Sequence, residues 1–280
     1  MKIGIIGGTG WLGSALGKAL LDRGHAPSDL VILNRSDPRE DYFGRQVVWA
    51  ADVADLVDRS DAIILSVRPQ DWPALNFDAK GKLAISFMAG VNIATLGDRV
   101  IRAIPNAAAE IGTSYSPWFA GSAVTADDKA TANDILSAFG TCDELASETD
   151  IDLMTALSGS GPAYPALMAA AMMKFLTDNG VSTDIAARAT EATICDAAQL
   201  LRGETQNATE WVKVFVDYAG TTAAGLTTAE AGGFSTALYS GLTAATQKAK
   251  DMGRIKPPPP HCPRGANNRQ GYSLRQLRHR

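Results

Sequence analysis

Apolar and polar positions at the start of the chain change from one period to another. Ile3, Ile5 and Ile6 form a short apolar run, a cluster of glycines follows, and apolar residues then recur at helical spacing to about Arg23. This order predicts a buried strand, a tight turn and an amphipathic helix that ends at Gly24.

The turn between that strand and that helix has the pattern G-x-G-x-x-G. Its six residues are Gly8, Thr9, Gly10, Trp11, Leu12 and Gly13. Glycines here would turn the chain, let backbone N–H groups approach a pyrophosphate and let the helix pack close to the strand. The helix N-terminus would face the anion with its partial positive charge. We therefore expect these six residues to bind a dinucleotide; the alternative is a glycine-rich turn of another α/β protein.

Further apolar runs predict a parallel sheet. They lie at residues 30–33, 46–50, 62–67, 82–88 and 99–104. A helix at 127–139 and a last strand at 142–146 would complete a domain over residues 1–150. Ligands in open α/β sheets bind at the carboxyl ends of the strands. Site-like residues follow these strand ends, namely Val67, Arg68, Pro69 and Asn106.

The end of the second predicted strand indicates the cofactor. Asn34, Arg35 and Ser36 stand there, where NAD enzymes place an acidic residue that accepts ribose hydroxyls. An arginine offers a fork of donors to a 2′-phosphate, whereas a carboxylate would repel it. We therefore expect these three residues to bind NADPH. NADH is possible because Asp37 lies nearby.

The pattern changes to long helical segments over residues 151–253. They are rich in Ala, Leu and Met and separated by glycines, which predicts an all-α domain. Residues 163–175 are apolar over more than one face, more than a domain of about 100 residues can cover alone. We therefore expect a homodimer or a higher homo-oligomer.

Composition excludes several classes of protein. A chain of 280 residues with 46% hydrophobic residues has ample material for one large or two ordinary domains. Residues 254–280 hold seven Lys and Arg, no Asp or Glu and four consecutive prolines, which predicts a disordered basic tail. Residues 1–253 carry 19 basic and 30 acidic residues, which argues against a nucleic-acid surface.

The sequence indicates neither a membrane segment nor a cysteine-based site. The longest uncharged apolar stretch is too short to span a bilayer and no signal-like segment opens the chain, so we expect a cytoplasmic protein without a membrane partner. Cys142, Cys195 and Cys262 are far apart and form no C-x-x-C pair, so we expect neither disulfides nor a metal site.

Several segments together resemble the pyrroline-5-carboxylate reductase family, in order and spacing, over residues 1–253. The run Ser-Gly-Ser-Gly-Pro-Ala-Tyr is the most specific match and the glycine turn the least. The matching segments are the glycine turn, 67–70 (VRPQ), 86–91 (SFMAGV), 104–106 (IPN), 155–164 (TALSGSGPAY), 220–226 (GTTAAGL) and 230–234 (EAGGF).

This resemblance implies a Rossmann domain followed by an all-α dimerisation domain, with each active site built from two subunits. In the family, NADPH gives its hydride to the imine carbon of pyrroline-5-carboxylate, which forms proline. The family's Lys-Pro near the nicotinamide corresponds to Arg68-Pro69, and its Asn after the sixth strand to Asn106. Its substrate loop, Ser-Pro-Gly-Gly-Thr-Thr, aligns with residues 217–222, so the substrate carboxylate is expected at Asp217, Gly220 and Thr221, with Asn106 beside it.

The first half of that loop departs from the family pattern. Asp217-Tyr218-Ala219 replaces Ser-Pro-Gly, and an ionised Asp217 would repel a substrate carboxylate by about 1 to 4 kcal/mol at about 4 Å. Bulky Trp118 and Phe119 also stand where the family usually has small residues. Another cyclic imine therefore stays open as the substrate beside pyrroline-5-carboxylate.

The histidines are not placed for acid–base chemistry, which disfavours an alcohol dehydrogenase. His25 ends the first predicted helix, and His261 and His279 lie in the tail. Hydride addition to a protonated cyclic imine needs positioning rather than a strong acid, so Thr222 or Ser158 could orient the ring or relay a proton as the catalytic hydroxyl. Three alternatives remain: a deazaflavin-dependent NADP reductase, an enzyme of the hydroxyacid dehydrogenase type, and a non-catalytic dimer that senses a dinucleotide.

Overall fold

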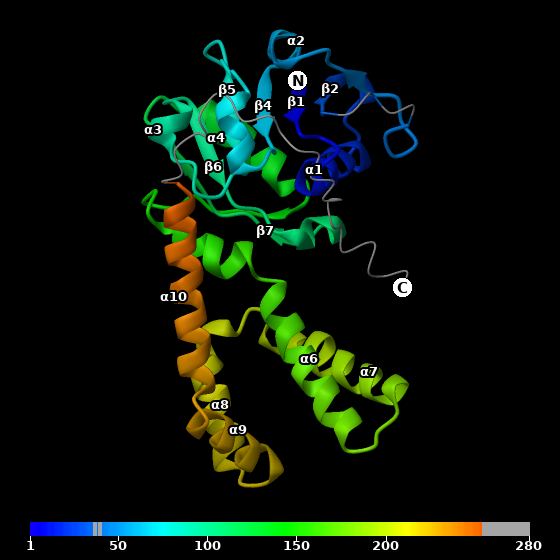
Figure 1. The fold of residues 1–280 in the computed structure, drawn as a ribbon, viewed down its shortest axis with the longest axis vertical. Coiled ribbons are helices and arrows are strands. Elements are labelled where there is room, and N and C mark those ends of the chain that lie inside the picture. The colour runs from blue at the N-terminus through cyan, green and yellow to red at the C-terminus, as the bar shows by residue number, and fades with distance from the viewer. Residues whose placement is uncertain (36–37, 39–40, 254–280) are drawn as a thin grey trace, which may run out of the picture. The chain divides into compact units, whose positions relative to one another are not determined.

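The computed structural model describes residues 1–35, 38 and 41–253 (Figure 1). The expectations for Ser36, for Asp37 and for a disordered tail at 254–280 lie outside this part. The described residues form two compact units: one contains the described part of Met1–Ser160 together with residues 245–253, and the other contains Gly161–Ala244.

A mainly parallel sheet forms the centre of the first unit. Within the described residues it has seven strands in the order β3-β2-β1-β4-β5-β6-β8. They are β1 (Ile3–Ile6), β2 (Leu30–Leu33), β3 (Val48–Trp49), β4 (Ala62–Leu65), β5 (Leu83–Ser86), β6 (Val100–Ala103) and β8 (Trp118–Ala120). All pairs are parallel except β6 with β8. β1 lies between β2 and β4, so the topological switch point of a Rossmann sheet lies at β1.

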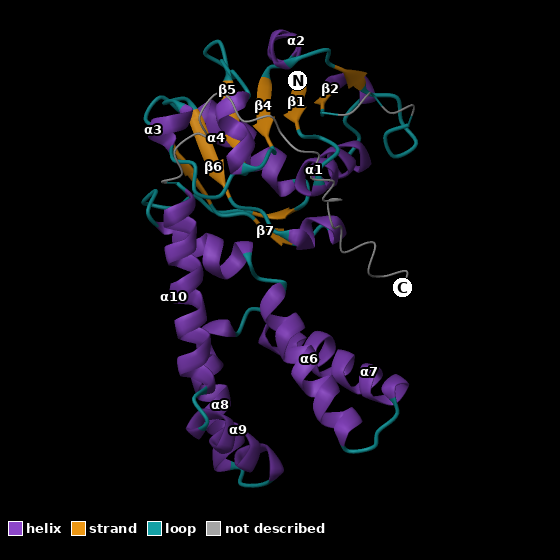
Figure 2. Cartoon of the chain, in the orientation of Figure 1, coloured by secondary structure: helices purple, strands orange, loops and turns teal. Residues whose placement is uncertain are grey.

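Helices cover both faces of this sheet (Figure 2). Alternate strand residues point to opposite faces, so Ile5 packs with Leu16 of α1 and Ile135 of α4, whereas Ile63 packs with Leu56 of α2. The helices are α1 (Trp11–Asp22), α2 (Val53–Arg59), α3 (Ile93–Leu96), α4 (Ala126–Ser137) and α5 (Asp150–Met154), with short turns η1 (Pro27–Asp29), η2 (Pro69–Ala74), η3 (Ala107–Ile111) and η4 (Thr155–Gly159).

The sequence patterns located most of these elements. The predicted strands at 30–33, 62–67, 82–88 and 99–104 are confirmed, mostly as shorter strands, and α1 ends next to Gly24, whose φ is +92°. The strand predicted at 142–146 is wrong: β9 (Gly140–Thr141) pairs with β7 (Ser114–Tyr115), and only an isolated bridge to Trp118 follows at Glu144.

Trp118 belongs to the core and not to a substrate pocket. Its side chain is 1% exposed in the cluster that also holds Phe139 and Ile101. The bulky residue that departs from the family pattern at this position therefore has a packing role.

The second unit is helical, and no strand occurs in its residues 161–244 as described. Its elements are α6 (Ala163–Asp178), α7 (Thr183–Glu191), η5 (Ala192–Asp196), η6 (Ala197–Leu201), η7 (Thr205–Asn207), α8 (Ala208–Asp217), α9 (Thr221–Ala231) and most of α10 (Phe234–Met252). The contact boundary falls after Ser160, ten residues beyond the predicted one. The last turns of α10 belong to the first unit.

Apolar side chains are widely exposed on the second unit. In the described chain, α6 buries none of its residues, and Leu167 and Phe175 are 72% and 66% exposed. Exposed apolar side chains gathered on one helix are typical of interaction surfaces on soluble domains. As for membranes, none of the described helices combines the length and the apolar character needed for a transmembrane span.

Candidate functional site

The glycine turn joins β1 to α1 through close backbone contacts. Gly7 has φ of +85°, and a Cβ on it would lie 2.2 Å from the carbonyl oxygen of Ser66 at the end of β4. A Cβ on Gly13 would lie 2.4 Å from the Gly7 oxygen. Gly10 is the N-cap of α1, with extended backbone. The space that side chains would fill is thus backbone-lined, as a pyrophosphate cradle requires.

The first turn of α1 has backbone donors that are free to bind an anion. Trp11 and Leu12 begin the helix, so their N–H groups have no intrahelical acceptor. The predicted motif began at Gly8, but the left-handed residue is Gly7, which sequence spacing alone did not single out.

Two side chains hold the turn in place. Asn34, at the end of β2, donates from Nδ2 to Oγ1 of Thr9 over 3.2 Å. The buried Tyr42 donates its hydroxyl to the carbonyl oxygen of Gly8 over 2.8 Å, and a Cβ on Gly17 would lie 2.2 Å from that hydroxyl. Tyr42 was not predicted, because nothing in the local pattern distinguishes it from other tyrosines.

Arg35 and Arg68 meet at one carboxylate. Arg68 binds Asp71 at two points, Nε to Oδ2 at 2.9 Å and Nη2 to Oδ1 at 3.2 Å, and Nη1 of Arg35 lies 3.6 Å from the same Oδ2. The hydrogen bond to Asp71 raises the pKa of Arg68 above its ordinary value. Two predicted cofactor residues, one after β2 and one after β4, are thereby brought together. Asp71 itself was not predicted.

The neighbours of Arg68 have packing roles. Val67 packs against the core on one face of the sheet, and Pro69 begins η2. Their predicted contact with the cofactor stays a prediction.

Asn106 connects β6 to the turn that follows α5. Its Oδ1 accepts from the N–H of Ala108 at 2.9 Å, which caps η3, and its Nδ2 donates to the carbonyl oxygen of Ser158 at 2.8 Å. Most of the hydrogen-bonding capacity of this amide is therefore used inside the unit. We interpret Asn106 as a residue that positions Ser158, with one N–H left for a ligand.

Ser158 lies in the π-type turn η4, a feature that is frequent at functional sites. Its hydroxyl donates to the carbonyl oxygen of Met154 at 3.0 Å, so its lone pairs remain as acceptors. A Cβ on Gly159 would lie 2.8 Å from a methyl carbon of Ile104, which explains why a glycine stands there in the Ser-Gly-Ser-Gly run.

The predicted substrate loop belongs to the second unit. Asp217 ends α8, Gly220 is the N-cap of α9, and Thr221 and Thr222 form the first turn of α9 with exposed side chains. Ala219 adopts φ of +50°, a left-handed conformation, where the family pattern has glycine.

Asp217 is paired within its own helix. Nζ of Lys213 lies 2.5 Å from its Oδ2. Both side chains are well exposed, so the ion pair is solvated, and its two charges sum to zero. The repulsion expected from Asp217 is thereby weakened.

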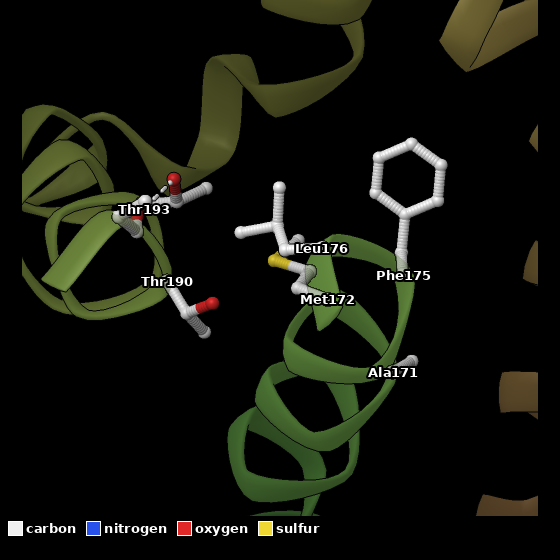
Figure 3. Close-up of a pocket in the computed structure, with 7 residues that line it drawn as sticks. Ala171, Met172, Phe175, Leu176, Thr190 and Thr193 are labelled. Atoms are coloured by element: carbon white, nitrogen blue, oxygen red, sulfur yellow. Dashed lines mark hydrogen bonds between the residues drawn. The ribbon is translucent and has the colours of Figure 1, made fainter. Parts of the chain in front are cut away.

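A hollow of about 470 Å³ in the second unit lies between α6 and the α7–η5 segment (Figure 3). Every side chain lining it is apolar or a threonine, which does not suit a phosphate or a carboxylate. The lining residues are Ala171, Met172, Phe175, Leu176, Ala189, Thr190 and Thr193. It continues the exposed apolar surface of α6.

Comparison with known proteins decides the family. Residues 148–252 match the family model for pyrroline-5-carboxylate reductase dimerisation, and residues 2–90 match that for NADP oxidoreductase, coenzyme F420-dependent. A pyrroline-5-carboxylate reductase of Methanosarcina acetivorans is 30% identical over 271 residues, covering 90% of this chain and 98% of the relative. The chain belongs to the pyrroline-5-carboxylate reductase family.

Solved structures agree with this membership. The pyrroline-5-carboxylate reductase of Streptococcus pyogenes is 30% identical with a TM-score of 0.78. The alignment covers 90% of this chain and 98% of the Streptococcus pyogenes chain. The pyrroline carboxylate reductase of Plasmodium falciparum, solved with NADP bound, is 25% identical with a TM-score of 0.80 over the same shares. The match to the F420-dependent model covers the nucleotide-binding part of a pyrroline-5-carboxylate reductase family member.

Proposed function

We propose that this chain is an NADPH-dependent imine reductase that converts pyrroline-5-carboxylate, or a closely related cyclic imine, into the saturated amine. The observation that carries the proposal is the pair Arg35 and Arg68, gathered within 3.6 Å of one carboxylate oxygen beside the glycine turn. In a chain of this family, two guanidinium groups at the switch point favour a cofactor with a 2′-phosphate.

The residues fit a dinucleotide because backbone atoms line the turn between β1 and α1 where side chains at Gly7 and Gly13 would otherwise stand. The N–H groups of Trp11 and Leu12 would bind the pyrophosphate, and Asn34 and Arg35 the adenosine ribose with its 2′-phosphate. The bound cofactor would supply the hydride. The protein's part is to hold the ring that receives it in a fixed orientation.

The substrate end of the proposal rests on the turn into α9. The first-turn N–H groups of this helix suit a carboxylate, and Ala219 adopts a left-handed conformation that glycine, the residue of the family pattern, enters readily. Thr222 would orient the imine or relay a proton, with Ser158 as the second candidate hydroxyl. Lys213 offsets the charge of Asp217, which supports a carboxylated substrate.

We also propose that the active unit is a homodimer or larger homo-oligomer in the cytoplasm. Support comes from the apolar exposure of α6 and from the match of residues 148–252 to the dimerisation model. Burial of such an apolar surface against a second copy is more favourable than its exposure to water.

The proposal is tested by following NADPH absorbance with the purified full chain. Pyrroline-5-carboxylate, a six-membered carboxylated imine and uncarboxylated 1-pyrroline form the panel, and NADH is the comparison cofactor. We expect oxidation of NADPH with a carboxylated imine and a slower reaction with NADH. Binding of NADPH without oxidation by any imine would favour the dinucleotide-sensing dimer and reject the reductase.

A further inference from the structure

We propose that Asp71 sets the strength of the cofactor preference, because it is a built-in anion that neutralises part of the positive charge that Arg35 and Arg68 present to a 2′-phosphate. The inference rests on the proposed function only in taking a 2′-phosphorylated nucleotide as the ligand. It concerns this carboxylate, which the sequence patterns did not indicate.

The geometry places one anion between two cations. Oδ2 of Asp71 lies 2.9 Å from Nε of Arg68 and 3.6 Å from Nη1 of Arg35, so a single oxygen is shared by both guanidinium groups. The side chain of Asp71 is 20% exposed, against 73% for Arg35 and 57% for Arg68. The carboxylate is thus the inner member of the cluster, and both arginines face solvent around it.

Asp71 is also held by its backbone. Its N–H donates to the carbonyl oxygen of Arg68 at 2.9 Å, in the turn that Pro69 begins. This bond fixes the main chain of Asp71, so the carboxylate has a shorter reach than the longer arginine side chains. When an external anion arrives, the guanidinium groups can turn toward it while Asp71 stays behind them.

The cluster lies at the glycine turn. Arg35 directly follows Asn34, whose amide is bonded to Thr9, and Arg68 comes two residues after Ser66, whose carbonyl oxygen abuts Gly7. The two arginines therefore follow the strands on either side of β1, at the carboxyl edge of the sheet where a dinucleotide binds, and Arg35 stands where the ribose is read. Arg68, which the family resemblance sets near the nicotinamide, is joined to Arg35 through Asp71.

Charge then decides the effect. Two arginines and one aspartate leave a net charge of about +1 for a phosphate, whereas the arginines alone would offer +2. A guanidinium has five N–H donors and Arg68 uses two of them on Asp71, so donors remain for phosphate oxygens. Asp71 accordingly lowers the affinity for 2′-phosphorylated nucleotides and leaves nucleotides without that phosphate almost unaffected.

Calorimetric titration of the full chain tests this directly. The probes are 2′,5′-ADP, which carries the 2′-phosphate, and 5′-AMP, which does not. We expect Asp71→Asn to bind 2′,5′-ADP roughly tenfold tighter, as the loss of one negative charge about 5 Å away in a largely aqueous setting allows. Binding of 5′-AMP should not change.

Three variants separate this effect from others. Asp71→Ser should act in the same direction as Asp71→Asn, whereas Asp71→Glu keeps the charge and should stay within about twofold of the wild type. Asp98→Asn removes one exposed negative charge elsewhere in the unit and should leave both titrations unchanged.

The proposal is overturned if Asp71→Asn binds 2′,5′-ADP with equal or lower affinity, because the carboxylate would then be irrelevant or would act by positioning the arginines. Failure of the proposed function looks different. A wild type that reduces no imine, but whose Asp71→Asn variant still tightens on 2′,5′-ADP, would reject the reductase and keep this inference.

Discussion

The two units of the chain differ in how far each completes its own core. In the nucleotide-binding unit, every residue of β1, β4 and β5 is buried. In the described helical unit, α6, α8 and α9 bury no residue at all. The first unit therefore buries its central strands with its own apolar side chains, whereas the helices of the second unit need another molecule to bury theirs. This difference separates the part that binds the cofactor from the part that requires assembly.

The largest effect should come from a charge on the exposed apolar surface of the helical unit. We expect Leu167→Glu to convert the dimer to a monomer at micromolar concentration and to lower turnover more than about 100-fold, because burying an unpaired charge costs several kcal/mol. Analytical ultracentrifugation and the NADPH assay measure both. Ile111→Glu, at an exposed apolar residue of the first unit, should leave the assembly state unchanged. A Leu167→Glu variant that stays dimeric would contradict the inference that the exposed apolar surface of the helical unit is covered by a second copy.

Thr222→Val tests whether the helical unit contributes chemistry as well as assembly. If the hydroxyl forms a hydrogen bond mainly in the transition state, turnover should fall roughly 10 to 100-fold, about 1.4 to 2.7 kcal/mol, with NADPH affinity nearly unchanged. Thr228→Val, an exposed threonine in the same helix, is the matched control. Equal kinetics for the two variants would make the loop structural.

Arg35→Ala tests the first unit alone. NADPH binding should weaken about tenfold while NADH binding stays the same, since only the former loses a charged hydrogen bond to its 2′-phosphate. Arg68 remains in place, so the loss should be partial. Fluorescence titration with both cofactors gives the ratio, and an equal loss for both would show that Arg35 does not read the phosphate.

Asp217→Ser should have a smaller effect. The exposed ion pair with Lys213 already offsets the aspartate, so the KM for a carboxylated imine should fall only about threefold. The KM for 1-pyrroline should not change. If both substrates respond alike, the loop acts through its backbone and not through charge.

Asp128→Asn addresses stability and should leave turnover unchanged. Asp128 is nearly buried, binds Arg99 at two points and closes the capping box of α4 with Thr125. We expect a loss of about 1 to 2 kcal/mol in unfolding free energy at pH 7. The exposed Asp178→Asn, which breaks the pair of Lys174 within α6, should cost less than about 0.5 kcal/mol.

The effect of Asp128 should depend on pH. The hydrogen bond from Arg99 lowers the pKa of this carboxyl. Its stabilisation is therefore complete above the unfolded pKa of about 4 and is lost as pH falls through the lower pKa of the folded state. Urea unfolding at pH 7 and at acid pH should show that the free energies of unfolding of the wild type and of Asp128→Asn converge at acid pH.

Sequence patterns located the parts of the fold that repeat a period or fill a buried strand. Runs such as 62–65 are apolar throughout, so β4 was predictable, and the glycine turn was predictable because its spacing reflects backbone contact. The strands β7 and β8 are too short to show a period. Asp71 and Tyr42 act through residues far away in sequence, and their roles depend on tertiary contacts that no local pattern records.

The course of α10 has a practical consequence for dividing this chain into pieces. The first part of α10 belongs to the helical unit and its end belongs to the nucleotide-binding unit. Just after that end, a Cβ added to Gly253 would lie 2.2 Å from the carbonyl oxygen of Gly90. The helical unit is thus an insertion, with both ends returning to one host. A fragment that stops at residue 160 would lack a piece of its own packing. Expression of the nucleotide-binding half should therefore join residues 1–160 to 245–253 through a short linker.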